Sequence, residues 1–185
     1  MASWLLPDYI FASYRDVTPE FLRKIGVKAL LIDIDNTLAP YEMPEPDDAI
    51  RAWFKCLAES GIQATLVSNN DKERVELFNV TLGLPAYYKS GKPFAKNLRK
   101  AMAALGTDET NTAMLGDQLL TDAAAGKHIG LRTIIVPPIR DKNNAFFRSK
   151  RAMEVKHIKK YVKLHGGNAA EICSFWLEKR FKKKS

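Results

Sequence analysis

The sequence KALLIDIDNT at residues 28–37 decides the fold. Its first half is an almost uninterrupted apolar run, which is typical of a parallel strand buried on both faces. The run ends in Asp33 and Asp35, so two carboxylates follow the expected strand. Ligands of open parallel sheets bind beyond the carboxyl ends of the strands, near the point where the strand order reverses. The stretch therefore predicts a central strand that opens onto a functional site.

Strand and helix patterns alternate on the C-terminal side of this stretch. Apolar residues recur at helical spacing from Ile50, with Asp47 as the expected N-cap and Gly61 as the terminal glycine. Further strands are expected at residues 62–67, 86–88, 112–115 and 131–136, and further helices after Asp71, from Pro93 to Leu105, around 123–125 and over 146–164. Such alternation indicates right-handed crossovers between parallel strands. We predict an α/β three-layer sandwich with a mostly parallel five-stranded sheet in the order 3-2-1-4-5, counted from the strand at 28–33.

Length and composition favour one compact domain. The 185 residues are 46% hydrophobic and 27% charged, which excludes a disordered or fibrous chain. We assign residues 28–165 to the main domain and residues 1–27 to an apolar segment packed on or near its core. Residues 166–185 are assigned to a basic, aromatic tail.

The net charge of +8 is concentrated at the C-terminal end of the chain. Residues 1–139 carry a net charge of −2, whereas residues 140–185 contain 14 basic and 4 acidic groups. Phe175, Trp176 and Phe181 lie among these basic residues. Three roles stay open for the tail: peripheral contact with an anionic membrane, non-specific nucleic-acid binding, or a solvated end.

The cysteines and the N-terminal residues indicate a cytoplasmic protein. Cys56 and Cys173 have neither metal-binding nor redox spacing, and no basic leader or apolar run of about 18 residues is found. Neither cysteine is accompanied by the glycine-rich loop and arginine of a cysteine phosphatase, so we expect both to be packing residues. The basic tail suits peripheral contact at the inner face of the membrane.

Polar residues follow four of the expected strands. Besides Asp33 and Asp35, these are Ser68 and Asn69 after the second strand, Lys92 after the third, and Asp117 and Asp122 after the fourth. Four carboxylates in one pocket repel one another unless a cation neutralises them, and hard oxygen ligands favour Mg²⁺. We expect Mg²⁺ ligands from Asp33, Asp117 and the backbone carbonyl of Asp35, with Asp122 as support for the ligands.

The same residue types suit the hydrolysis of a phosphomonoester. Asp33 can attack phosphorus as a nucleophile, and Asp35, two residues further on, can protonate the leaving oxygen and later activate water. The Ser68 hydroxyl, the Asn69 backbone N–H and the Lys92 ammonium can stabilise charge on the phosphate oxygens. Thr37 is expected to fix the loop, and Asn36, Asn70 and Gln118 are candidates for lining the pocket.

These residues also carry a family resemblance. DxDxT at 33–37, Ser68 after a strand, Lys92 before Pro93 and GDQxxTD at 116–122 resemble the four motifs of the haloacid dehalogenase-like (HAD) phosphatases of subfamily IIIA. The chain also resembles the YqeG family in its motif sequences DIDNTL and GDQLLTD, in its length and in its basic C-terminal end. This family is related to the phosphatidylglycerophosphate phosphatases. The resemblance implies a Rossmann-like HAD fold, phosphatase activity, and phosphatidylglycerophosphate as the preferred substrate.

The spacing of the motifs leaves no room for a large cap domain. Thr37 and Ser68 are separated by 30 residues, and Ser68 and Lys92 by 23, which the predicted elements already use. HAD-like enzymes insert their caps in these two intervals. An open site suits either a substrate too large to enclose or a lid supplied by a partner chain or by the tail, and we favour a phosphate on a polymer or at a bilayer surface.

Two other functions remain open at this point. One is a soluble HAD phosphatase for a sugar phosphate or a nucleic-acid end. The other is a basic binding module in which the pocket senses phosphate or a metal, as in receiver domains. In receivers, however, the acidic pair precedes a separate phosphoaccepting aspartate on a later strand, and this order differs from the one seen in the sequence.

Overall fold

The computed structural model describes residues 4–140 and 145–178. The elements are β1 (Tyr9–Ile10), a 3₁₀ turn (Tyr14–Asp16), α1 (Pro19–Lys24), β2 (Ala29–Ile32), α2 (Asp48–Glu59), β3 (Gln63–Val67), α3 (Lys72–Asn79), β4 (Ala86–Tyr87), α4 (Lys96–Leu105), β5 (Thr112–Gly116), a π-helical turn (Leu119–Ala123), α5 (Ala124–His128), β6 (Arg132–Ile135), α6 (Ala145–His165), α7 (Ala169–Ile172) and α8 (Ser174–Glu178). Strands and helices alternate from β2 to β6, as predicted.

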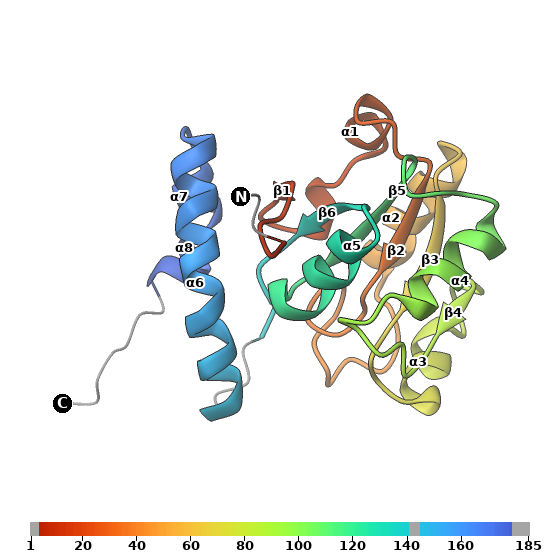
Figure 1. The fold of residues 1–185 in the computed structure, drawn as a ribbon. Coiled ribbons are helices and arrows are strands. Elements are labelled where there is room, and N and C mark those ends of the chain that lie inside the picture. Colours follow the sequence, from red (N-terminus) through yellow and green to blue (C-terminus); the bar gives the residue numbers. More distant parts are fainter. Residues whose placement is uncertain (1–3, 141–144, 179–185) are drawn as a thin grey trace.

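The sheet confirms the predicted strand order and adds one strand. All pairs are parallel, in the order β1-β6-β5-β2-β3-β4 (Figure 1). The five expected strands correspond to β4-β3-β2-β5-β6, so the predicted reversal between the first and fourth strands lies between β2 and β5. The predicted number of strands, five, is too low by one, because it did not include the edge strand β1.

Strand β1 was missed because two residues are too few to show an alternating pattern. Its pairing with β6 is extended by the Phe11 N–H, which donates to the Ile135 carbonyl. The Ile10 N–H donates to the Tyr161 hydroxyl of α6. Part of the N-terminal apolar segment therefore belongs to the sheet itself.

Alternate residues of β2 face two separate cores. Leu30 and Ile32 pack with side chains of α1, α2 and α3, whereas Leu31 packs with side chains of α4 and α5. All four residues of β2 are buried, as expected for a central parallel strand. Helices therefore cover both faces of the sheet, which is the predicted three-layer arrangement.

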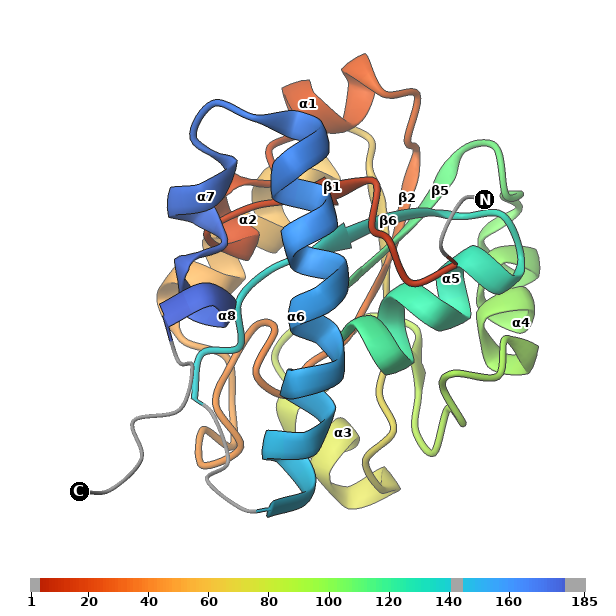
Figure 2. The same ribbon diagram turned by 60° about the vertical axis from the view of Figure 1, so that its left-hand side comes forward.

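Helices α6, α7 and α8 pack together beside the β1–β6 end of the sheet (Figures 1 and 2). Ile158 and Trp176 are almost completely buried there. Residues 169–177 of the predicted tail thus contribute to a hydrophobic core rather than to a free aromatic surface. Residues 179–185, with Phe181 and five basic side chains, lie outside the described part of the chain. No helix within the described residues is long and apolar enough to span a membrane.

The predicted start of a helix at Pro93 is wrong, because α4 begins at Lys96. Residues 91–94 instead form a turn, in which the Phe94 N–H donates to the Gly91 carbonyl. The Asn69 side chain holds this turn through both the backbone N–H and the carbonyl of Lys92. Pro93 therefore belongs to the loop that carries Lys92 and not to helix α4.

Candidate active site

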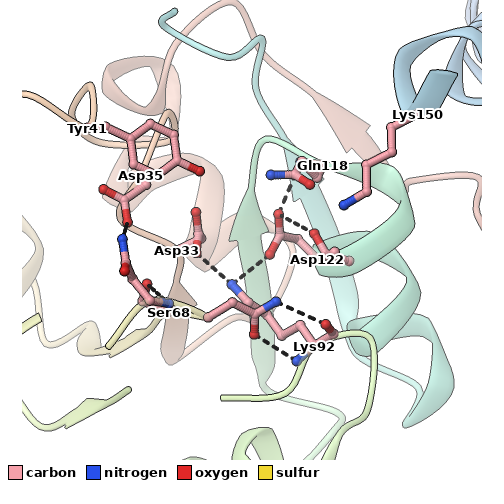
Figure 3. A pocket seen from close by; sticks show the side chains of 11 residues that line it. Asp33, Asp35, Tyr41, Ser68, Lys92, Gln118, Asp122 and Lys150 are labelled. Atoms are coloured by element: carbon pink, nitrogen blue, oxygen red, sulfur yellow. Dashed lines mark hydrogen bonds and ion pairs between the residues drawn. The ribbon is translucent and has the colours of Figure 1, made fainter. Parts of the chain in front are cut away.

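One pocket of about 360 Å³ opens at the carboxyl ends of the central strands (Figure 3). It is lined by Asp33, Asp35, Tyr41, Ser68, Asn69, Asn70, Lys92, Gln118, Thr121, Asp122 and Lys150. Every predicted site residue except Asp117 is in this set, and Asp117 is fully buried with a carboxylate oxygen within 4.8 Å of oxygens of Asp33 and Asp122. The predicted convergence of four strand ends is therefore present.

Asp33 lies directly after β2, where its side chain is held on two sides. The Thr37 hydroxyl donates to Oδ2 at 3.3 Å, and Lys92 Nζ donates to Oδ1 at 2.7 Å. Burial raises the pKa of Asp33 to about 7, although the charge of Lys92 opposes this rise. The fixed orientation of the carboxyl group is that of a preorganised reactant.

Lys92 is buried, and its ammonium group contacts three oxygen-bearing groups. Nζ lies 2.7 Å from oxygens of Asp33 and Asp122, and it donates to the Val67 carbonyl at 2.7 Å. Burial lowers the pKa of Lys92, but the two carboxylates outweigh burial and leave the pKa above its ordinary value. Lys92 therefore stays charged in the pocket and links the strand ends of β2, β3 and β5.

Asp117 and Asp122 complete a buried acidic cluster with Asp33. An added Cβ at Gly116 would lie 2.3 Å from Cγ of Asp122, so only glycine leaves room for the Asp122 carboxyl. Asp122 Oδ2 accepts the Gln118 N–H at 3.1 Å. The π-helical turn and Gly116 together place this carboxyl against Lys92.

The acidic cluster fits a divalent metal ion. Each of the three aspartates offers an oxygen within 4.8 Å of the others. Among the described residues, Asp117 Oδ1 is buried and finds no hydrogen-bond donor. Burial raises the pKa of Asp117 well above its usual range, although Arg151 opposes this rise. A hard cation would satisfy the open oxygen and favour the ionised carboxylates.

Helix α6 reaches the acidic cluster through Arg151. Its guanidinium donates to Oδ2 of Asp117 at 3.0 Å and to the Asp117 carbonyl at 3.3 Å. The same group donates to Glu154 at 2.7 Å, and Glu154 in turn accepts the Leu119 N–H at 2.9 Å. The helix thus holds the loop after β5 at three points.

Asp35 lies across the pocket from the acidic cluster. Arg74 of α3 approaches Oδ1 with Nε at 3.1 Å and with a terminal nitrogen at 2.9 Å. Asn70 donates to Oδ2 at 3.1 Å. Because Arg74 also donates to the Pro44 carbonyl, it ties the Asp35 carboxyl to the loop that precedes α2.

Ser68 and Asn69 follow β3 and have different local roles. Ser68 is buried at the pocket wall, where its hydroxyl accepts the Asn70 N–H at 3.1 Å. The Asn69 side chain anchors the loop of Lys92 and accepts the Ser90 hydroxyl. The side-chain amide of Asn69 is therefore occupied by the loop. The group that the sequence analysis assigned to phosphate binding is a different one, the backbone N–H of Asn69.

The structure adds residues that the sequence did not single out. These are Tyr41, Thr121 and Lys150 in the pocket wall, and Arg74 and Arg151 behind the carboxylates. Of the additional candidates, Asn70 and Gln118 line the pocket, whereas Asn36 does not, because its side chain accepts the Arg140 N–H. The two cysteines are also outside the pocket lining, and Cys56 is exposed rather than packed.

The fold and the pocket define a class of protein. The parallel sheet presents two aspartates after one strand at its reversal point. Neighbouring segments add a serine, a lysine and a second pair of aspartates. This is the arrangement of a HAD-like hydrolase. The HAD-hydrolase-like family model matches residues 89–138. A putative 3-deoxy-D-manno-octulosonate 8-phosphate phosphatase from Vibrio cholerae shares the fold, with a TM-score of 0.52 and 16% identity over 86% of this chain and 89% of that one.

Sequence comparison narrows the class to a family. The probable phosphatase YqeG of Bacillus subtilis is 35% identical over 83% of this chain and 90% of its own length. The chain belongs to the YqeG family of HAD phosphatases. It is also 29% identical to the chloroplastic phosphatidylglycerophosphate phosphatase 1 of Chlamydomonas reinhardtii over 78% of this chain, and it spans 57% of that longer protein. Membership of a phosphatase family favours the enzyme over the sensing module.

Proposed function

We propose that this phosphatase hydrolyses a phosphomonoester with the help of Mg²⁺, through a phosphorylated Asp33. The observation that carries the proposal is the buried Asp33 carboxyl, which is held between Thr37 and Lys92 at the floor of the pocket. A carboxylate in such a position can split hydrolysis into two displacements. In the first, an Asp33 oxygen attacks phosphorus, and the bond from phosphorus to the alcohol oxygen breaks.

Asp35 is proposed to move the protons of both steps. It protonates the departing alcohol oxygen in the first displacement and accepts a proton from the water that attacks the phosphorylated Asp33 in the second. The products are the alcohol and inorganic phosphate, and Asp33 is regenerated. Support comes from the position of Asp35, which lines the same pocket as Asp33 and is oriented by Arg74 and Asn70.

Charge on the transferred phosphoryl group is proposed to be stabilised by Lys92, the Ser68 hydroxyl and the Asn69 backbone N–H. The Mg²⁺ ligands would be Asp33, Asp117 and the Asp35 carbonyl, with Asp122 beside them. The bound cation would neutralise negative charge on the phosphate oxygens and on the carboxylates. The buried oxygen of Asp117 that lacks a donor among the described residues supports this assignment.

The preferred substrate in this proposal is phosphatidylglycerophosphate. The similarity to proteins named phosphatidylglycerophosphate phosphatase supports a lipid substrate, and so does the short spacing between the motifs, which accommodates no lid domain. A pocket at the protein surface can accept a headgroup whose acyl chains remain in a bilayer.

A phosphate-release panel tests the function and the substrate together. With Mg²⁺ present, we expect the highest kcat/KM for phosphatidylglycerophosphate in vesicles, compared with a lysophospholipid phosphate, sugar phosphates and phosphorylated oligonucleotides. Chelation by EDTA should abolish turnover, and Mg²⁺ should restore it. A higher kcat/KM for a sugar phosphate or an oligonucleotide would replace the lipid by that substrate, and no turnover of any ester would reject the phosphatase mechanism.

The substitution Arg74→Met tests whether Asp35 protonates the leaving alcohol oxygen. Loss of the ion pair frees the Asp35 carboxyl, so we expect kcat/KM for glycerol 3-phosphate, which reports the first displacement, to fall by about 100-fold, the scale of general acid catalysis. The loss for p-nitrophenyl phosphate should be much smaller, because its leaving group needs no proton. Arg99→Met, which changes an exposed arginine of α4, is the matched control. Equal losses of kcat/KM on both substrates would show that Arg74 does not act through protonation of the leaving group.

The basic end is proposed to hold the enzyme at an anionic membrane. Deleting residues 179–185 removes Lys179, Arg180, Lys182, Lys183 and Lys184 but leaves the buried Trp176 in place. Each basic residue near such a surface contributes about 1 kcal/mol, so turnover on anionic vesicles should fall at least tenfold. Turnover of a soluble phosphate ester should stay unchanged, and replacing the five residues by Gln should reproduce the deletion. Equal losses on both substrates would contradict membrane binding.

A further inference from the structure

Phe94 is the most exposed large hydrophobic side chain among the described residues, with an exposed fraction of 73%. It lies two residues after Lys92, in the turn where its own N–H donates to the Gly91 carbonyl. The Asn69 side chain binds both the N–H and the carbonyl of Lys92, so this turn is fixed to the pocket wall. The exposed ring therefore belongs to a well-anchored loop beside the pocket.

Lys89, at the start of the same loop, has a backbone conformation that favours glycine. Its φ is +43°, and Asn36 is the only other non-glycine residue with a positive φ in the part of the chain that the structure describes. A side chain is strained in this region, which glycine adopts freely, so the lysine points to a use for its side chain. Lys89 is exposed and forms no ion pair with any described residue. Its ammonium group is available to an anionic partner.

The surroundings of this loop are basic. Residues 77–107 contain five basic residues and no acidic residue, and four of the five are exposed. The fifth is Lys92, which is buried in the pocket. Residues 1–139 as a whole carry a net charge of −2, so the positive charge of this segment is a local feature. Such a surface attracts anions to the side of the pocket formed by the loop after β4.

A second exposed apolar side chain lies on the other side of the pocket. Ile139 follows β6 and is 48% exposed, and its N–H donates to the Asn36 carbonyl in the loop after β2. Strands β5, β2 and β3 lie between β6 and β4. Because all strands are parallel, the segments that follow β4 and β6 leave the sheet at the edge where the pocket opens (Figures 1 and 2). Phe94 and Ile139 therefore flank the pocket.

We propose that Phe94, Lys89 and Ile139 form a surface that seats the pocket on an anionic lipid bilayer. This inference rests on the proposed function and deepens it, because a lipid phosphate reaches the pocket only when the pocket faces the bilayer. Apolar side chains enter the boundary between headgroups and acyl chains, while lysines bind the anionic headgroups. The basic C-terminal end would add attraction to the membrane, whereas this surface would set the orientation of the enzyme.

The pair of apolar side chains favours a bilayer over a nucleic acid. Single-stranded nucleic acids stack their bases on aromatic rings, which Phe94 offers but the aliphatic Ile139 does not. A bilayer is also an extended, flat partner, and such a partner can contact both sides of the pocket at once.

Vesicle binding tests the surface without turnover. The full-length protein is sedimented with vesicles of phosphatidylcholine and phosphatidylglycerol, which contain no phosphomonoester. We expect Phe94→Ser to weaken binding by about tenfold, because the side chain no longer transfers an aromatic ring out of water. Phe94→Trp should retain binding. Ile139→Ser should weaken binding further when it is added to Phe94→Ser.

Lys89→Gly tests the charge separately from the stability of the loop. We expect about fivefold weaker binding, the effect of one basic residue near an anionic surface. The melting temperature should stay close to that of the wild type, because glycine adopts the φ of +43° without strain. Lys28→Ala is the matched control, since Lys28 is exposed and precedes β2 at the opposite edge of the sheet. Leu164→Ser, near the far end of α6, is the control for an exposed apolar side chain. Both controls should bind as the wild type does.

Turnover distinguishes this surface from the phosphatase function. Phe94→Ser should lower the ratio of kcat/KM for phosphatidylglycerophosphate in vesicles to kcat/KM for soluble glycerol 3-phosphate by about tenfold. If Phe94→Ser and Lys89→Gly bind vesicles as the wild type does, the surface is rejected, while hydrolysis of the soluble ester would leave the phosphatase function standing. A wild type that binds vesicles but hydrolyses no ester would reject the phosphatase instead. If a single-stranded oligonucleotide binds more tightly than the vesicles and Phe94→Ser weakens that binding, nucleic acid replaces the bilayer as the partner.

Discussion

Asp33→Asn should reduce kcat for phosphate release by roughly 10⁴-fold or more, the scale of losing a covalent nucleophile. The amide has nearly the same shape as the carboxyl, but it cannot form the phosphorylated intermediate. Oδ1 of Asp33 accepts Lys92 at 2.7 Å, and an amide oxygen can still accept this bond. The fold should therefore survive, with a melting temperature close to that of the wild type. The measurement is Mg²⁺-dependent release of phosphate from an aryl phosphate and from the lipid.

The matched control for this experiment is Asp48→Asn, which changes a fully exposed aspartate of α2 and should leave kcat unaltered. Burst-phase trapping of ³²P on the wild-type protein, and its loss in Asp33→Asn, would locate the covalent step. Turnover of the Asp33 variant within tenfold of the wild type, with the fold intact, would remove Asp33 from the reaction and reject the proposed mechanism.

Lys92→Met should have the second large effect, on both stability and turnover. Methionine fills the space of the lysine stem but leaves Asp33 and Asp122 without their shared cation. Breaking a buried ion pair by removing one partner typically costs about 3–5 kcal/mol, and we expect a loss of this size in the free energy of unfolding. Phosphate release should become undetectable, because the charge on the transferred phosphoryl group loses a main partner. Urea denaturation without metal measures the stability.

A double variant isolates the electrostatic cause of this loss. Adding Asp33→Asn to Lys92→Met removes one unpaired carboxylate, so the pair should be more stable than Lys92→Met alone. Lys96→Met, at the exposed start of α4, serves as the control for loss of a lysine. If Lys92→Met unfolds at the same urea concentration as the wild type, the buried network does not support the fold.

The sheet and the floor of the pocket could be predicted because their signals are local. The apolar run before Asp33 identifies a buried strand, and the parallel topology then brings all carboxyl ends to one edge. The positions of Ser68 and Asp117, each directly after a strand, follow from this rule alone. The N-cap at Asp47 is equally local, and it was found as expected.

The groups that orient the carboxylates could not be predicted, because they depend on tertiary contacts. Arg74 lies 39 residues from Asp35, and Arg151 lies 34 residues from Asp117. On their helices both residues have the pattern of ordinary surface charges. Strand β1 was not predicted for a related reason, since its pairing with β6 joins residues more than 120 positions apart. The turn at Pro93 depends on Asn69, whose side chain holds it from another strand end.

The late position of α6 in the chain has a consequence for biosynthesis. All four motifs have left the ribosome before Arg151, so a nascent chain that has already formed the parallel sheet still lacks the guanidinium partner of Asp117. Domains generally fold as units during synthesis, and here a late segment supplies the cation that pairs with the buried Asp117. A recombinant fragment that ends at residue 140 would keep every motif yet lose both this ion pair and the core around Trp176. Truncation of the gene at that point is therefore expected to yield an insoluble product.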